Sequence, residues 1–150
     1  MKKYLRFLFI VMAVLLSACQ PSQQNHIHKK VSGEKMIKVS VNNKTFKLLL
    51  NDSTAAREFR ETLPLTLKMS DVNGNEKYAV LDRDFTSNNH RAGKIHSGDL
   101  KLWAGNGLVL FYDDFSSSYS YTDLGKIVDN SGLADSLGRG SVTVTFEEEN

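Results

Sequence analysis

The sequence predicts one mainly β domain whose strands close into a barrel, together with two short helices. About six to eight short segments place apolar residues at every second position, which is the pattern of strands with one buried face. Turn signals such as Asn-Gly separate these segments, so most strands are expected to pair with their neighbours in sequence. Closure into a barrel removes the exposed strand edges that so many short strands would otherwise leave.

Residues 1–18 have the pattern of a lipoprotein signal peptide. A segment with positive charges precedes an apolar run, residues 7–16, that is too short to span a bilayer. The sequence LSAC at residues 16–19 resembles the lipobox of bacterial lipoproteins, in which the signal is cut just before a lipid-bearing cysteine. The resemblance implies lipid attachment at Cys19; the alternative is an ordinary secretory signal followed by a chance cysteine.

A lipid on Cys19 predicts a protein of the cell envelope, anchored on the extracytoplasmic side of a membrane. Two or more acyl chains are needed for durable anchoring. Gln20, rather than Asp, after the cysteine permits outer-membrane sorting in an organism with two membranes, by analogy with other lipoproteins. Residues 19–35 are polar and lack a hydrophobic period, so we expect a flexible tether. Since the chain has one cysteine, the domain has no thiol for a disulfide, a zinc site or a nucleophile.

The charge of the chain argues against a nucleic-acid partner. The formal net charge of the 150 residues is +2, but without the signal's Lys2, Lys3 and Arg6 there are 16 basic against 17 acidic residues, a net charge of −1. Nucleic-acid binding requires clustered Lys and Arg that displace counterions, and no such cluster is present. The acidic tail, residues 147–150, is expected to be a solvated end that discourages pairing.

The predicted domain, residues 36–146, begins with a hairpin. Apolar and polar residues alternate in Met36–Val41 and again in residues 45–50. Between them, residues 42–43 are both Asn, which tolerates the positive φ of a tight turn.

A helix is predicted after this hairpin. Asp52 or Ser53 can cap its start, and apolar residues recur at helical spacing over residues 55–63. Pro64 is expected to end the helix after about eleven residues, because proline disfavours the helical region for the residue before it.

A second hairpin is predicted around Asn73-Gly74. Residues 65–69 alternate, and residues 77–81 form the return strand. The pattern Asp-x-Asn-x-Asn at residues 71–75 imitates the start of a calcium loop, but that loop requires Gly at its sixth position and Glu at its twelfth. A turn is therefore favoured over a calcium site. Residues 86–97 are polar and without period, so no strand is predicted there.

The last part of the chain adds a hairpin, a helix and a closing strand. Residues 100–103 and 108–112 flank a Gly-rich turn, and the second of them is apolar on both faces, as in a strand covered on both sides. Residues 130–137 predict a short helix that Gly138 ends. Residues 142–146 form the final strand.

Several stretches together resemble the bacterial cyclophilin-like domain family. They are NNKTF at 42–46, LPLTL at 63–67, DVNGNEKY at 71–78, GDL at 98–100, LVLFY at 108–112, YSYT at 119–122 and LGRGSVTVTF at 137–146. The resemblance covers about residues 36–146 and implies an eight-stranded β-barrel with a helix at each end. The Phe-His-Arg and Gln-Gly-Gly-Asp patterns of catalytic cyclophilins are absent from the sequence, and Arg83 with Phe85 is the nearest local substitute.

The histidines carry no strong signal for a metal site. His26 and His28 fall on the predicted tether, where no fold fixes their geometry. His90 and His96, with Asp99 nearby, lack a spacing that would bring their side chains together. Solvated histidines are favoured in both cases, and no metal or other cofactor is predicted.

The candidate ligand-binding residues are aromatic. Five aromatic residues fall within residues 111–121, at a strand end and a Ser-rich loop, and rings with polar tips favour clefts for small molecules or peptides. The plainer alternative is that these rings pack over a barrel end. If a cleft exists, we expect Tyr112, Tyr119 and Tyr121 to line it, and the resemblance places Asn75 and Glu76 nearby as polar partners.

The leading functional hypothesis is a non-enzymatic, membrane-anchored module that binds a small ligand or an extended peptide. The tether, the aromatic segment and the lack of a catalytic set support it. The alternatives are a peptidyl-prolyl cis-trans isomerase acting on exported proteins and a structural component of the envelope. Fold alone does not choose among them.

Overall fold

The computed structural model describes residues 35–149. The predicted signal peptide, Cys19 and the tether up to residue 34 lie outside this range, as does Asn150. In the part that is described, none of the helices has the length and apolar character needed to cross a membrane.

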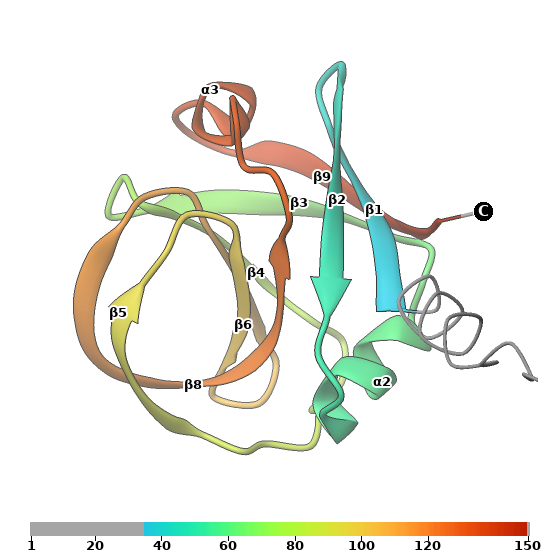
Figure 1. Ribbon diagram of the computed structural model, residues 1–150, viewed down its shortest axis with the longest axis vertical. Helices are drawn as coiled ribbons and strands as arrows, with labels where there is room; N and C mark the ends of the chain where they lie inside the picture. Colours follow the sequence, from blue (N-terminus) through green and yellow to red (C-terminus); the bar gives the residue numbers. More distant parts are fainter. Residues whose placement is uncertain (1–34, 150) are drawn as a thin grey trace, which may run out of the picture.

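The described residues form nine strands and two helices. In chain order they are β1 (Met36–Val41), β2 (Lys44–Leu50), α2 (Thr54–Arg60), β3 (Leu65–Val72), β4 (Glu76–Val80), β5 (His90–Ile95), β6 (Asp99–Trp103), β7 (Gly107–Phe111), β8 (Phe115–Ile127), α3 (Leu133–Leu137) and β9 (Val142–Glu148). Eight strands pair in the order β2-β1-β9-β3-β4-β7-β6-β8, and β8 pairs back onto β2 to close a ring (Figure 1). The predicted mainly β fold with a closed set of eight strands and two short helices is confirmed.

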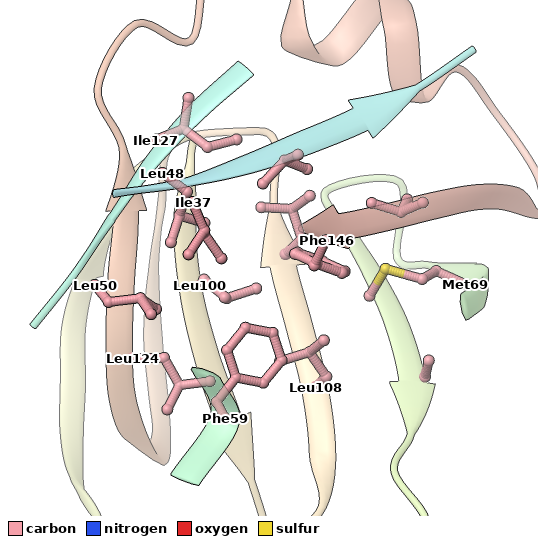
Figure 2. Packing of buried hydrophobic residues seen from close by; sticks show 14 of the residues in the cluster. Ile37, Leu48, Leu50, Phe59, Met69, Leu100, Leu108, Leu124, Ile127 and Phe146 are labelled. Atoms are coloured by element: carbon pink, nitrogen blue, oxygen red, sulfur yellow. The ribbon is translucent and has the colours of Figure 1, made fainter. Parts of the chain in front are cut away.

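The interior of the ring is filled by one apolar cluster. Inward residues alternate along the strands, as Ile37, Val39 and Val41 do on β1, and all three are fully buried or nearly so. Leu50, Leu100, Leu108 and Leu124 converge on the ring of Phe59 from α2 (Figure 2). α2 and α3 lie at opposite ends of the ring and add Phe59, Leu133 and Leu137 to the same cluster (Figure 1).

A second, smaller apolar cluster lies outside the ring. Every residue of β7 is buried, so the prediction that this strand is covered on both sides is confirmed. Leu108 and Leu110 face the interior, whereas Val109 and Phe111 face outward and pack with Ile95 and Tyr121. The outward face of β7 is therefore covered by β5 and by the first half of β8, which pair with each other (Figure 1).

Two predictions were wrong: that residues 86–97 hold no strand, and that the Ser-rich segment within residues 111–121 is a loop. The polar residues 86–97 contain β5, and the Ser-rich segment belongs to β8, which runs for 13 residues. Residues 116–120 of β8 are half-buried or exposed, so their sequence lacks the apolar alternation that marks a half-buried strand. Their pairing with β5, rather than burial, makes them a strand.

The ends of three elements differ from the predictions. α2 begins after Ser53, whose hydroxyl accepts the Ala56 N–H, but it ends at Arg60, four residues before Pro64. α3 starts only at Leu133 and ends before Gly138, as predicted. Glu148 and Glu149 in the acidic tail are solvated, as expected. The expectation that the tail discourages pairing was wrong, because β9 continues through Glu148 and pairs with β1, and Lys38 binds Glu147 at 2.7 Å.

Candidate functional site

A cavity of about 280 Å³ opens on the outward side of β4 and β7, under the first half of β8. Its walls are mostly apolar and include four aromatic rings. The lining residues are Val72, Asn73, Glu76, Tyr78, Trp103, Val109, Tyr119 and Tyr121. Small-molecule sites are typically concave, mostly apolar and equipped with a few polar groups, and this cavity has that character.

Strand alternation and register bring one wall of the cavity together. On β4, Lys77 and Ala79 are buried toward the interior, so Glu76 and Tyr78 face outward. Tyr78 lies opposite Val109 in the antiparallel pairing of β4 with β7. The hairpin turn between β3 and β4 has positive φ at Asn73 and Gly74, which confirms the predicted turn and places Asn73 at the edge of the cavity.

β8 supplies the opposite wall. Tyr119 and Tyr121 are two residues apart and share a face of the strand. Tyr121 is buried, with its ring 5.5 Å from Phe111 at an interplanar angle of 88°. The edge-to-face contact fixes the inner end of the wall. Tyr119 is 66% exposed and lies at the mouth.

Gly107 makes room for the aromatic pair at the other end of the cavity. The rings of Tyr78 and Trp103 lie 6.3 Å apart at 71°. A Cβ added at Gly107 would stand 2.6 Å from Cε2 of Tyr78 and 2.9 Å from the Trp103 carbonyl oxygen. The absence of a side chain at this position is thus what allows the Tyr78 ring to lie against β7.

The electrostatic character of the cavity is set by one carboxyl group. Burial raises the pKa of the Glu76 carboxyl. Burial also raises the pKa of the Tyr121 hydroxyl, and the nearby negative charge of Glu76 raises it further. Among the described residues that line the cavity there is no Lys, Arg or His. A negative group therefore stands in an apolar, aromatic environment.

The structure brings together three of the five predicted ligand-binding residues. Glu76, Tyr119 and Tyr121 line the cavity. Tyr112 does not: its ring packs against the main cluster, and its hydroxyl donates to Asp71 over 2.9 Å. Asn75 is also absent from the lining; its backbone carbonyl accepts the Tyr112 N–H, and its side-chain oxygen is buried with no hydrogen-bond partner in the described part of the chain.

Five lining residues were not predicted: Val72, Asn73, Tyr78, Trp103 and Val109. Part of the signal was present in the sequence, because Tyr78 is on the predicted return strand and stands two residues after Glu76. β4 begins one residue earlier than predicted, at Glu76, so the two side chains share a face. Trp103 gave no such signal. Its contact with Tyr78 depends on the order of β4, β7 and β6 in the sheet, which local sequence does not specify.

Arg83 and Phe85, the nearest local substitute for an isomerase pair, lie away from the cavity. The Arg83 guanidinium donates to the backbone carbonyl of Glu58 on α2 and lies 4.8 Å from the centre of the Phe85 ring. Phe85 is itself part of the main apolar cluster. This arginine therefore stacks on the core and holds the loop after β4 against α2.

The two histidines of the described residues lie beside different carboxylates. His90 Nε2 is 3.1 Å from Asp123, and His96 Nδ1 is 3.7 Å from Asp114. Within residues 35–149, no three His, Cys, Asp or Glu side chains are grouped closely enough to hold a metal ion.

Comparison with known proteins decides the family. The model of the cyclophilin-like family matches residues 39–147, nearly the whole described domain. The chain belongs to the cyclophilin-like family. Among solved structures, this cyclophilin-like domain is similar to the solution structure of the hypothetical protein AF2241 from Archaeoglobus fulgidus, with a TM-score of 0.58 and 17% identity. The match covers 79% of this chain and 97% of the archaeal one, and at this identity it shows the fold alone.

No curated protein matches the chain. The membership in the cyclophilin-like family thus establishes the fold, and any function must be argued from the cavity.

Proposed function

We propose that this cyclophilin-like domain is a binding module, held outside the cell membrane by lipid on Cys19, that takes a small ligand or an extended peptide into the cavity. The observation that carries the proposal is the cavity itself, lined by Tyr78, Trp103, Tyr119 and Tyr121. Trp103 and Tyr119 are 46% and 66% exposed. Large aromatic side chains that stay exposed around a concave surface are typical of recognition sites.

The size of the cavity limits the occupant. Sites for drug-sized ligands occupy about 300–1,000 Å³. At about 280 Å³, the cavity matches a small molecule or one side chain of a bound peptide. Because Tyr119 lies at an exposed mouth, the rest of a peptide could extend along the surface beside β8.

The residues of the cavity favour binding over prolyl isomerisation. That reaction needs a positioned cation at the prolyl amide nitrogen, an electrostatic effect that depends on placement. In the part of the chain that the structure describes, no Lys or Arg lines the cavity, and Arg83 is engaged with α2 and Phe85. A protease-coupled proline-peptide assay on the full chain is expected to give no rate above background, and a rate that Arg83→Lys abolishes would favour the isomerase instead.

A screen tests the binding role. The full chain, purified in detergent, is mixed with a panel of small cationic, neutral and anionic compounds and of short peptides, and the shift in melting temperature is recorded. Hits are expected to lose their shift in Tyr119→Ala and keep it in Val128→Ala. Both residues are exposed, at 66% and 63%, and Val128 lies outside the cavity. Hits that are indifferent to Tyr119→Ala would contradict the proposal.

A separate experiment tests the anchor. Cys19→Ser is expected to leave the signal uncut and to remove incorporation of labelled palmitate, because the lipidated thiol is absent. Ser22→Ala, three residues further on, serves as the control and should be processed normally. If Cys19→Ser leaves processing and membrane fractionation unaltered, the proposed location is wrong.

A further inference from the structure

The cavity combines two features that together specify the charge of its ligand. Four aromatic rings line it, and one acidic side chain, Glu76, lies among them. An aromatic ring presents negative potential over its face and attracts cations, and trimethylammonium groups in particular are bound by groups of such rings. Anionic ligands would face both the rings and the carboxylate without any compensating cation.

Glu76 has no cationic partner among the residues that the structure describes. Elsewhere in residues 35–149, buried or half-buried carboxylates have cationic partners: Asp71 pairs with Lys77, and Asp123 pairs with Lys101. Within the same range the Glu76 carboxylate forms no ion pair and no hydrogen bond, and burial alone accounts for its shifted pKa. A half-buried carboxylate without a partner is costly unless a counter-charge neutralises it.

Burial raises the pKa of Glu76, in keeping with the missing counter-charge. A cation placed beside the carboxylate would reverse this effect and favour its ionised form. The free cavity thus contains an acidic group that a bound cation would stabilise.

Resting on the binding role proposed above, we infer that the ligand of this cavity is an organic cation, a substituted ammonium group enclosed by Tyr78, Trp103, Tyr119 and Tyr121 with its charge beside Glu76. The cavity of about 280 Å³ suits a small compact cation. The same chemistry is offered by a free quaternary ammonium compound and by a lysine side chain of a peptide. Titration with choline and with a lysine derivative distinguishes these two sources.

The test is isothermal titration of the full chain in detergent with choline chloride and with 3,3-dimethylbutan-1-ol, at matched ionic strength. The second compound has the shape of choline with carbon in place of nitrogen, so the difference between the two measures the charge. We expect choline to bind about tenfold or more tightly than the alcohol, as cation–π attraction in a desolvated site implies. N-acetyl-lysine methylamide is the third titrant; a stronger response to it than to choline identifies a peptide side chain as the source.

Two matched substitutions locate the cation. Glu76→Gln keeps the shape of the side chain and removes its charge, and it should remove most of the preference for choline over the alcohol. Tyr119→Leu should weaken the binding of choline, whereas Tyr119→Phe should not, because only leucine lacks the aromatic ring. Melting curves of each variant show that it is folded.

The outcomes separate this inference from the binding role on which it rests. Equal affinity for choline and the alcohol would overturn the inference of a cationic ligand. Choline binding that is unaffected by Glu76→Gln and Tyr119→Leu would overturn it as well. If other panel compounds still bind in a way that Tyr119→Ala abolishes, the cavity remains a binding site for a neutral ligand. If no compound binds saturably, both proposals fail.

Discussion

The ammonium group of Lys77 donates to the carboxylate of Asp71 over 2.9 Å in a place where the lysine side chain is fully buried. Its other two protons are donated to the backbone carbonyls of Gly138 and Gly140, both at 2.8 Å. All three donors of the ammonium group are thus satisfied. The network ties β3 and β4 to the segment between α3 and β9.

Lys77→Met is expected to destabilise the domain by about 3–5 kcal/mol, because it leaves the Asp71 charge without its partner. The comparison is Lys38→Met. The side chains of Lys38 and Glu147, which form an ion pair, are 44% and 38% exposed. Loss of this pair should therefore lower the free energy of unfolding by less than about 1 kcal/mol. Urea unfolding of both variants measures the difference. Equal stability of the two variants would show that the buried pair is not a main support of the fold.

Tyr112→Phe is expected to lower stability by about 1.5–3 kcal/mol while leaving ligand binding unchanged, because the hydroxyl donates to a charged acceptor outside the cavity. Tyr119→Phe, at an exposed position, should change stability little. Urea unfolding gives the first quantity and the melting-temperature screen the second. Loss of binding in Tyr112→Phe without loss of stability would assign this residue to the ligand site after all.

Asp71 and Glu76, on the same hairpin, are expected to affect stability with opposite dependence on pH. The hydrogen bond from Lys77 lowers the pKa of Asp71 despite its desolvation, so its contribution is present above about pH 4 and is lost as pH falls through the lowered value. Burial raises the pKa of Glu76, so the folded state is favoured by this group at low pH and loses that advantage as pH rises through the raised value.

Two substitutions separate these contributions. Asp71→Asn should be less stable than the parent protein at neutral pH, with a difference that shrinks as the pH falls below about 4. Glu76→Gln should be equal to or more stable than the parent at neutral pH, with a difference that disappears in acid. Unfolding free energies measured across this range check both signs. The same sign for the two variants would contradict the account of the hairpin.

Gly125 allows the ring to close. It lies opposite Leu50 in the pairing of β8 with β2, and a Cβ at this position would stand 2.4 Å from the Leu49 carbonyl oxygen. Gly125→Ala is therefore expected to cost about 1–3 kcal/mol or more and to speed hydrogen exchange along β2. Ser118→Ala, exposed on the same strand, is the control. Unchanged exchange in Gly125→Ala would mean that the closure tolerates the added carbon.

The sequence predicted best those elements whose own burial pattern defines them. β1, β2 and β7 are recognisable because alternation or a continuous apolar run follows directly from one or two covered faces. β5 and the first half of β8 carry Ser, His and Arg and are strands because they pair with each other. That pairing joins distant residues and leaves no local period to detect.

The contrast between local patterns and long-range pairing also explains which cavity residues could be predicted from the sequence. Tyr119 and Tyr121 were detectable because a local excess of aromatic residues marks them. Tyr112 belongs to the same aromatic-rich stretch, yet its side chain contacts Asp71 and Lys77. That contact depends on the tertiary packing of residues far apart in the sequence. Tyr78 and Trp103 complete the cavity only through the order of strands in the sheet.

The cavity beneath β8 is the proposed ligand site, and the indole of Trp103 reports on it directly. Trp103 is the only tryptophan of the chain and lines the cavity, so its indole N–H gives one assignable signal in a ¹⁵N–¹H NMR spectrum. Titration of the full chain with choline, or with any hit of the screen, is expected to move this signal saturably together with the amides of Glu76 and Tyr78. Saturable shifts elsewhere, with the Trp103 indole unmoved, would contradict the account.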